Sequence, residues 1–157
     1  MSANSPSRLF TKLNLGAQRR IHVLDPPASF EGELGALKGV EILRSVVPND
    51  LVVFAMAFAM TQAAVDASSR KLAAAVHGDA VVWMAYPKGT SRRYQCDFNR
   101  DSGWKVLGAA GFEPVRMVAI DEDWSALRFR RVQYIKSMSR EPSRAVSAAG
   151  RRKAART

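Results

Sequence analysis

A cationic loop over residues 87–94 carries the side chains best suited to bind a ligand. It follows an apolar run at 80–86 and combines ammonium, guanidinium and hydroxyl groups with one glycine: Lys88, Gly89, Thr90, Ser91, Arg92 and Arg93. Cations, hydroxyl donors and a backbone without a Cβ suit a phosphate or another anion. The loop is no Walker motif, because Lys88 comes before the glycine and the Gly-x-x-x-x-Gly-Lys spacing is missing. The pattern therefore allows two interpretations, an exposed connection made polar for solubility and an anion or nucleic-acid contact.

The sequence shows no set of side chains that could catalyse a reaction by itself. Cys96 is the single cysteine, and although the arginines before it could favour its thiolate, no histidine lies nearby in sequence to act as its base. We expect a small thiol that is buried or half-buried. His22 and His77 are isolated and predict no metal site. The acidic residues at 121–123 are interpreted as a turn, so we predict no catalytic residue, no metal and no cofactor.

Basic residues gather at the two ends of the chain. The formal net charge is +10, with +4 in residues 1–20, +9 in residues 128–157 and −3 between them. Residues 137–157 are rich in Ser, Arg, Ala and Pro and poor in large aliphatic side chains, so we expect a disordered tail. Its charge could contact nucleic-acid phosphates through four residues: Arg151, Arg152, Lys153 and Arg156. The simpler interpretation is a solvated tail that only improves solubility.

Length and composition favour one cytoplasmic domain. We divide the 157 residues into a basic N-terminal extension at 1–18, an α/β domain at 19–136 and the basic tail at 137–157. The longest apolar run, at 51–60, is half of the roughly 20 residues that a membrane span needs. A lone cysteine cannot form the internal disulfides of a small secreted domain. We therefore expect a cytoplasmic protein without membrane contact.

Apolar patterns alternate between strands and helices along the chain. Strands are predicted at 20–24, 40–47, 51–60, 80–86, 112–120 and 125–132. Helices are predicted between capping and stop signals: 29–37 after Ser29, 61–76 from Thr61 to Gly78, and 101–110 after Asp101. The run at 51–60 lacks polar alternation, which is typical of a central parallel strand. This order predicts an α/β, Rossmann-like fold, a mostly parallel sheet with helices on both faces and a C-terminal antiparallel hairpin.

From residue 49 onward the chain resembles the second half of a class I, S-adenosylmethionine-dependent methyltransferase. The likeness rests on a buried strand at 49–54, a helix end at 72–79, a strand at 80–87 and the segment at 109–115. The chain also resembles a family of short bacterial proteins defined only as a domain of unknown function. The matching motifs are Trp-Met-Ala-Tyr-Pro-Lys at 83–88 and Asp-Glu-Asp-Trp-Ser-Ala-Leu at 121–127. The first resemblance implies a methyltransferase-like fold, and the second implies no activity.

The turn after the first strand departs from the methyltransferase pattern. Such enzymes carry a Gly-rich loop there, but this chain reads Leu-Asp-Pro-Pro-Ala-Ser-Phe at 24–30, and its prolines lack backbone donors. Gly32 and Gly35 fall inside the predicted helix, and Arg44 stands where a ribose-binding carboxylate is expected. We therefore predict a non-catalytic Rossmann-like protein that binds an anionic ligand or partner through 87–94. The alternatives are a nucleic-acid accessory protein that uses its basic ends, and a true methyltransferase.

Replacing Lys88, Arg92 and Arg93 together by alanine is expected to leave folding intact. Exposed charges contribute little to stability, about 0–1 kcal/mol for each ion pair that they form. The melting temperature of the triple variant should lie close to that of the wild-type protein. A large drop would mean that these side chains hold the fold together and do not serve a ligand.

Overall fold

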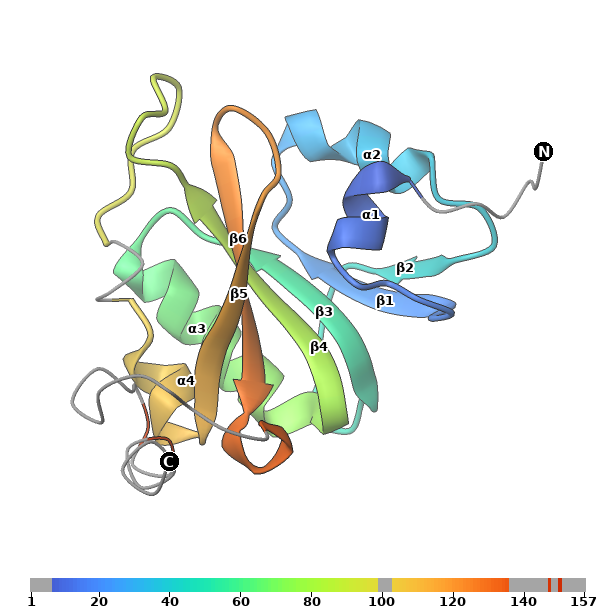
Figure 1. Ribbon diagram of the computed structural model, residues 1–157, viewed down its shortest axis with the longest axis vertical. Helices are drawn as coiled ribbons and strands as arrows, with labels where there is room; N and C mark the ends of the chain where they lie inside the picture. The colour runs from blue at the N-terminus through green and yellow to red at the C-terminus, as the bar shows by residue number, and fades with distance from the viewer. Residues whose placement is uncertain (1–6, 99–102, 136–146, 148–149, 151–157) are drawn as a thin grey trace.

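A computed structural model describes residues 7–98, 103–135, 147 and 150 of the chain. The strands are β1 (Arg20–Leu24), β2 (Glu41–Leu43), β3 (Val52–Phe58), β4 (Val76–Pro87), β5 (Phe112–Ala119) and β6 (Trp124–Arg131). The helices are α1 (Arg8–Lys12), α2 (Glu31–Gly35), α3 (Gln62–Ala75) and α4 (Lys105–Ala109), with short 3-10 helices η1 (Ala28–Phe30) and η2 (Val132–Tyr134). Figure 1 shows the sheet between α1 and α2 on one side and α3 and α4 on the other.

The six strands form one sheet in the order β2-β1-β3-β4-β6-β5. Strands β1 to β4 pair in parallel, and β6 pairs antiparallel with both β4 and β5. Among the described strands, β6 alone therefore runs against the others. The predicted mostly parallel sheet with a C-terminal hairpin is confirmed. The last residues of β1, β3 and β4 and the β5–β6 turn meet at one edge, which we call the carboxyl edge and which binds ligands in open α/β sheets.

Each face of the sheet is buried against its own helices, as the sequence predicted. On the face that we call the α1 face, Phe10 and Leu34 pack on residues of β1, β3 and β4 that include Ile21, Phe54 and Trp83. On the opposite face, the α3 face, a second cluster joins α3 and α4 to the sheet through Val65, Leu72, Leu107, Met84 and Phe129. Strand β3 lies between β1 and β4, so its continuous apolar run reflects burial on both sides.

Helix α3 begins where the sequence predicted, but it ends differently. The Thr61 hydroxyl accepts the backbone N–H of Ala64 at 3.1 Å and caps the helix. The predicted stop at Gly78 is wrong, because β4 begins at Val76 directly after the helix and Gly78, with φ +60°, lies inside that strand. With 14 residues, α3 is the longest helix of the described ranges, and none there is long and apolar enough to cross a membrane.

Three other boundaries differ from the predicted ones. Ser29 lies inside η1, where the Phe30 N–H bonds the carbonyl of Pro27 at 2.9 Å, so Ser29 does not cap α2. The strand predicted at 40–47 is reduced to β2, an edge strand that pairs only with β1. The helix predicted at 101–110 is α4, and Asp101 lies outside the described residues.

The described part of the segment predicted as an N-terminal extension, residues 7–18, packs into the domain. Ser7 caps α1 by accepting the N–H of Phe10 at 3.1 Å, and both Phe10 and Leu13 are fully buried. The indole N–H of Trp83 in β4 donates to the carbonyl of Leu13 at 2.8 Å. This buried hydrogen bond ties the segment to the middle of the sheet.

Two described residues of the C-terminal segment, Ser147 and Gly150, contact the start of β5. The carboxylate of Glu113, itself fully buried, accepts the backbone N–H of Ser147 at 2.6 Å and its hydroxyl at 2.8 Å. The Ser147 hydroxyl in turn accepts the N–H of Gly150. A buried carboxylate that receives several donors is well compensated for its loss of water. These contacts place part of the segment 137–157 against the domain, and its remaining residues lie outside the described ones.

His22 in β1 makes the stability of the fold dependent on pH. The side chain is 1% exposed, neither ring nitrogen has a hydrogen-bond partner among the described residues, and Nε2 lies 3.6 Å from a carboxylate oxygen of Asp50. Burial lowers the pKa of His22 below 6.5, and the negative charge of Asp50 opposes this shift. Arg20 lowers the pKa and Glu41 raises it, both with smaller effects. The unfolded chain therefore binds the proton more readily than the folded one. The contribution of neutral His22 to folding stability is present above pH 6.5 and declines as pH falls below this value.

We expect the free energy of unfolding, measured by urea denaturation, to fall less between about pH 7.5 and 5.5 in His22→Leu than in the wild-type protein. The exposed His77 provides the control, and His77→Leu should keep the wild-type pH dependence. An unchanged slope in His22→Leu would show that other groups cause the acid sensitivity.

Candidate functional site

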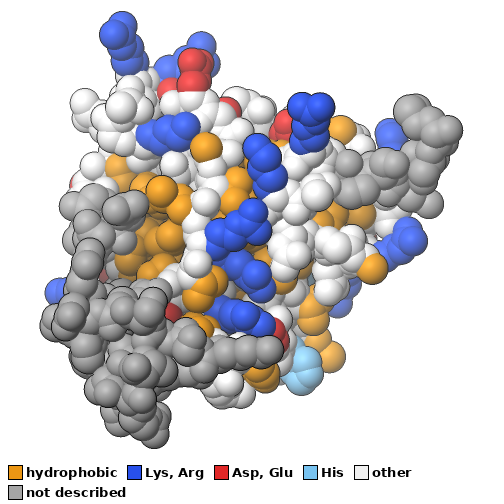
Figure 2. Space-filling view, in the orientation of Figure 1, with side chains coloured by type: hydrophobic (Ala, Val, Ile, Leu, Met, Phe, Trp, Pro, Cys, Tyr) orange, Lys and Arg blue, Asp and Glu red, His pale blue; other side chains and the backbone are white. Residues whose placement is uncertain are grey.

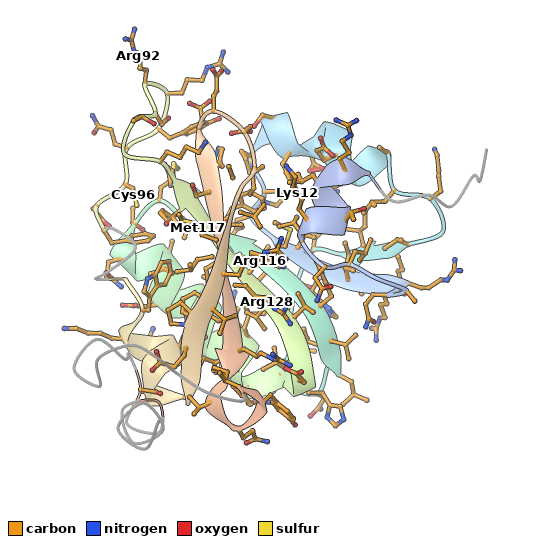
Figure 3. All side chains as sticks on the ribbon, in the orientation of Figure 1. Lys12, Arg92, Cys96, Arg116, Met117 and Arg128 are labelled. Carbon is orange, nitrogen blue, oxygen red and sulfur yellow. The ribbon has the colours of Figure 1, made fainter. Side chains whose placement is uncertain are left out.

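A pocket of about 970 Å³ opens at the carboxyl edge, on the α3 face of the sheet. The end of β4 and the loop that follows it supply most of its wall, and β5 and β6 supply one residue each. Its lining residues are Tyr86, Pro87, Lys88, Gly89, Thr90, Ser91, Tyr94, Gln95, Cys96, Asp97, Phe98, Met117 and Ser125. Figure 3 shows Cys96 and Met117 to the left of the β5–β6 hairpin, with Arg92 at the outer tip of the loop. The loop predicted to bind an anion thus forms one wall of a real pocket.

Backbone hydrogen bonds hold the loop in place above the pocket. The N–H of Lys88 donates to the carbonyl of Asp123 in the β5–β6 turn at 2.8 Å, which extends the pairing of β4 with β6 by one step. The N–H of Ser91 then donates to the carbonyl of Lys88 at 3.0 Å and closes a turn. Gly89 and Thr90 occupy the centre of this turn and are exposed.

Ser91 and the acidic turn stabilise the loop and each other. The Ser91 hydroxyl donates to the carboxylate of Asp123 at 2.9 Å and accepts the N–H of Tyr94 at 3.1 Å. The carboxylate of Asp121 accepts the N–H groups of Asp123 and Trp124, each at 2.8 Å. The interpretation of residues 121–123 as a turn is confirmed, and two of its carboxylates are used in local hydrogen bonds.

The floor of the pocket is apolar and aromatic. The Tyr86 ring lies 6.0 Å from the ring of Phe98 and 5.7 Å from that of Trp104, between centroids. Its hydroxyl lies 3.5 Å from the sulfur of Met117, which is 47% exposed and faces the opening. A ligand with a flat apolar body could therefore pack on this floor.

The structure brings together four of the six residues predicted to bind an anion. Lys88, Gly89, Thr90 and Ser91 line the pocket, whereas Arg92 and Arg93 are exposed and do not. Lys88 is half-buried at the rim, and its ammonium has no hydrogen-bond or ion-pair partner among the residues that the structure describes. The sequence did not point to Met117 or Ser125, because no local pattern places β5 and β6 beside the end of β4. It did not point to Tyr86 or Phe98 either, because apolar side chains in a strand and its loop predict only core packing.

Cys96 is half-buried in the pocket wall, as the sequence predicted. Burial raises the pKa of its thiol, the negative charge of Asp97 adds to this effect, and a backbone hydrogen bond near Phe98 opposes it. The thiol is therefore the stable form at neutral pH, which does not favour a role as a nucleophile. Within the described ranges, no three His, Cys, Asp or Glu side chains are grouped as a metal site would require.

The turn after β1 differs from a loop that could hold a nucleotide. Asp25 has φ +54°, and it is the only residue between 25 and 38 with a positive φ. The two prolines that follow provide no N–H donors, and η1 then turns the Phe30 ring onto that of Phe58, 4.9 Å away. At the end of β2, Arg44 forms a double hydrogen bond with Glu31 at 2.7 and 2.8 Å. The carboxyl ends of β1 and β2 are therefore occupied by structural contacts.

The predicted nucleic-acid contacts of the tail are outside the part of the chain that the structure describes. They are Arg151, Arg152, Lys153 and Arg156. They stay predictions.

The fold is Rossmann-like and is similar to that of solved methyltransferases. The chain is similar to an S-adenosylmethionine-dependent methyltransferase from Aquifex aeolicus, with 15% identity, a TM-score of 0.50 and 80% of this chain and 93% of that chain covered. It is similar to the N-methyltransferase NodS from Bradyrhizobium japonicum WM9, with 11% identity, a TM-score of 0.50 and 79% and 92% covered. It is also similar to the pyocyanin biosynthetic protein PhzM, with 12% identity, a TM-score of 0.50 and 78% of this chain covered. This chain spans about half, 54%, of that protein. Identities this low show the fold alone.

The sequence matches no protein-family model and no curated protein. The resemblance to a family of short bacterial proteins, which rests on the motifs at 83–88 and 121–127, therefore stays a prediction.

Substitution of Asp25 tests the strain in the turn after β1. A left-handed conformation costs most residues about 1–2 kcal/mol, and glycine adopts it freely. We expect Asp25→Gly to keep or raise the free energy of unfolding, measured with urea, and Asp25→Val to lower it by about 1–2 kcal/mol. As the control, Ala28→Gly in η1 should lower stability by about 0.5–1 kcal/mol, since that residue has an ordinary backbone conformation. An equal loss of unfolding free energy in Asp25→Gly and Ala28→Gly would contradict the presence of strain at Asp25.

Proposed function

We propose that this protein binds a small anionic molecule with an apolar, preferably aromatic, body in the pocket at the carboxyl edge, and that it does so without catalysing a reaction. The observation that supports the proposal is the composition of the pocket wall. One rim carries the ammonium of Lys88, unpaired within the described residues, beside the exposed turn at Gly89 and Thr90, and the floor carries the apolar surfaces of Tyr86, Phe98 and Met117. The volume of the pocket is within the range of pockets that take small ligands, roughly 300–1,000 Å³.

The rim and the floor of this pocket bind different parts of a ligand. A cation and the N–H groups of an open turn recognise a carboxylate, sulfonate or phosphate, because each supplies a donor to an oxygen anion. The apolar floor gains free energy from covering a hydrophobic body. Ser91 and Asp123 are engaged with each other, so they keep the rim in shape and leave recognition to Lys88 and the turn.

Methyl transfer is the alternative that the fold suggests, and the residues of this chain do not fit its cofactor. S-adenosylmethionine needs an open, donor-rich loop after β1 and an acceptor for its ribose at the end of β2. Here the first position holds Pro26 and Pro27, and the second holds Arg44 paired with Glu31. We also propose, from the composition of the sequence, that the protein is cytoplasmic.

Binding measurements with defined probes test the proposed function. Phenyl phosphate and benzoate represent the anionic ligand, and benzyl alcohol is their neutral counterpart. S-adenosylmethionine and S-adenosylhomocysteine represent the alternative. Calorimetry should detect the aromatic anions, a weaker signal or none for the alcohol, and no heat for either cofactor form. Binding of S-adenosylmethionine, or equal binding of the alcohol and the anions, would refute the proposal.

The variant Lys88→Ala should weaken binding of phenyl phosphate by about tenfold or more, because a charge-assisted hydrogen bond contributes about 1.5–3 kcal/mol. Its effect on benzyl alcohol should be small. The matched control is Arg93→Ala, which removes an exposed cation of the same loop outside the pocket and should leave the affinity unchanged. Met117→Ala should weaken binding of both phenyl phosphate and benzyl alcohol, because it removes apolar surface from the pocket floor and leaves the charge of Lys88 in place. Equal losses in Lys88→Ala and Arg93→Ala would mean that only the general charge of the loop matters.

A further inference from the structure

Basic side chains form a row on the α1 face of the β5–β6 hairpin, on the opposite face of the sheet from the pocket. Arg116 on β5 and Arg128 on β6 are direct partners in the antiparallel register. Arg130 follows two positions along β6, and side chains two positions apart share a face. Figure 2 shows a column of Lys and Arg side chains down the middle of the visible surface, and Figure 3 shows Lys12 of α1 above Arg116 and Arg128 along that line. We call Lys12, Arg116, Arg128 and Arg130 the basic row.

The positive charge of the row is only partly neutralised within the described residues. Arg130 is paired with Asp79 through two hydrogen bonds of 2.8 and 2.6 Å. The Nε of Arg128 is buried and has no hydrogen-bond partner, and Arg116 makes no ion pair or hydrogen bond in the ranges that the structure covers. Burial, followed by the charge of Arg130, lowers the pKa of the Arg128 guanidinium, and Arg116 adds to this effect.

Such an arrangement is unfavourable for the protein by itself. Like charges directly opposite each other on neighbouring strands destabilise a hairpin, and a buried guanidinium nitrogen without an acceptor loses its hydration without compensation. Asp79 is the only carboxylate near Arg128 among the groups that shift its pKa, and it is already bound to Arg130. An external group that brings oxygen anions to the row would relieve the repulsion between Arg116 and Arg128.

The shape of the row favours a long polyanion over a single small anion. The row follows the strand direction on the outside of the sheet, and guanidinium groups match phosphate oxygens with two parallel hydrogen bonds. Trp83, the aromatic residue that pairs with Arg128 in the sheet, is fully buried and cannot stack on bases. A single strand, whose binding relies on stacking platforms, is therefore less suited than a duplex, whose phosphates lie on its outside.

We propose that the basic row binds the phosphate backbone of a nucleic-acid duplex without reading its sequence. This surface is separate from the pocket, and it differs from the predicted contacts of the tail, Arg151, Arg152, Lys153 and Arg156. It gives four of the basic residues behind the positive net charge a specific location on the folded domain.

Fluorescence anisotropy with a labelled DNA duplex of about 20 base pairs tests this proposal on the full chain, at salt concentrations from about 50 to 200 mM. The double variant Arg116→Gln, Arg128→Gln should bind at least tenfold more weakly at the lowest salt. Its plot of log affinity against log salt should be shallower by about 1.8, because each phosphate that an arginine neutralises contributes about 0.9 to the slope. The charge-matched control is Arg70→Gln, Lys71→Gln, which removes two exposed cations from α3 on the other face and should change affinity far less.

Three outcomes would overturn the proposal. The first is an absence of duplex binding by the wild-type protein at the lowest salt. The second is equal weakening by the row variant and the α3 variant, or loss of binding only when the four predicted tail residues are changed to Gln. The third is binding to phosphatidylserine vesicles with the same dependence on Arg116 and Arg128 but no preference for DNA. If the double Gln variant melts at a lower temperature, Arg116→Lys, Arg128→Lys decides the question, since it keeps the charge and should retain most of the affinity.

Discussion

The antiparallel insertion of β6 between β4 and β5 is the constraint on which the rest of the structure depends. Because β6 runs against its neighbours, the β5–β6 turn lies at the carboxyl edge beside the end of β4. Asp123 in that turn can then receive the N–H of Lys88 and the hydroxyl of Ser91. The same insertion brings Met117 and Ser125 into the pocket wall. Without β6 in this place, the loop after β4 would have neither its support nor its opposite wall.

The two faces of this hairpin carry different chemistry because side chains alternate along a strand. Leu127 packs in the cluster with α3 and α4, and its partner Met117 lines the pocket, while Arg116 and Arg128 face the other way. A small ligand and a polyanion could therefore be bound on opposite sides of one hairpin. Both proposed sites gather positive charge over a domain whose central part is slightly acidic, so each would draw an anion to a specific place.

Sequence reasoning succeeded where the pattern is local. The apolar run at 51–60 predicted a central strand and β3 is one, Thr61 predicted the start of α3, and the acidic residues at 121–123 predicted a turn. It failed where a local signal competes with tertiary contacts. Gly78 is a common kind of helix stop, yet here it serves a strand that follows the helix without a loop. Ser29 is a good capping residue, yet the burial of Phe30 against Phe58 draws the chain into a 3-10 turn instead.

By itself, the sequence determined the fold class, the absence of a glycine-rich turn after β1 and the cationic character of the loop at 87–94, because periodicity, proline geometry and charge are properties of neighbouring residues. Only the tertiary structure decided which of those cations lines the pocket. Lys88 lies at the rim and Arg93 is exposed to solvent, since the bonds of the loop to Asp123, more than 30 positions away, set its path. It also decided that Arg116 and Arg128 stand side by side, because strand register is a long-range property that no single segment encodes.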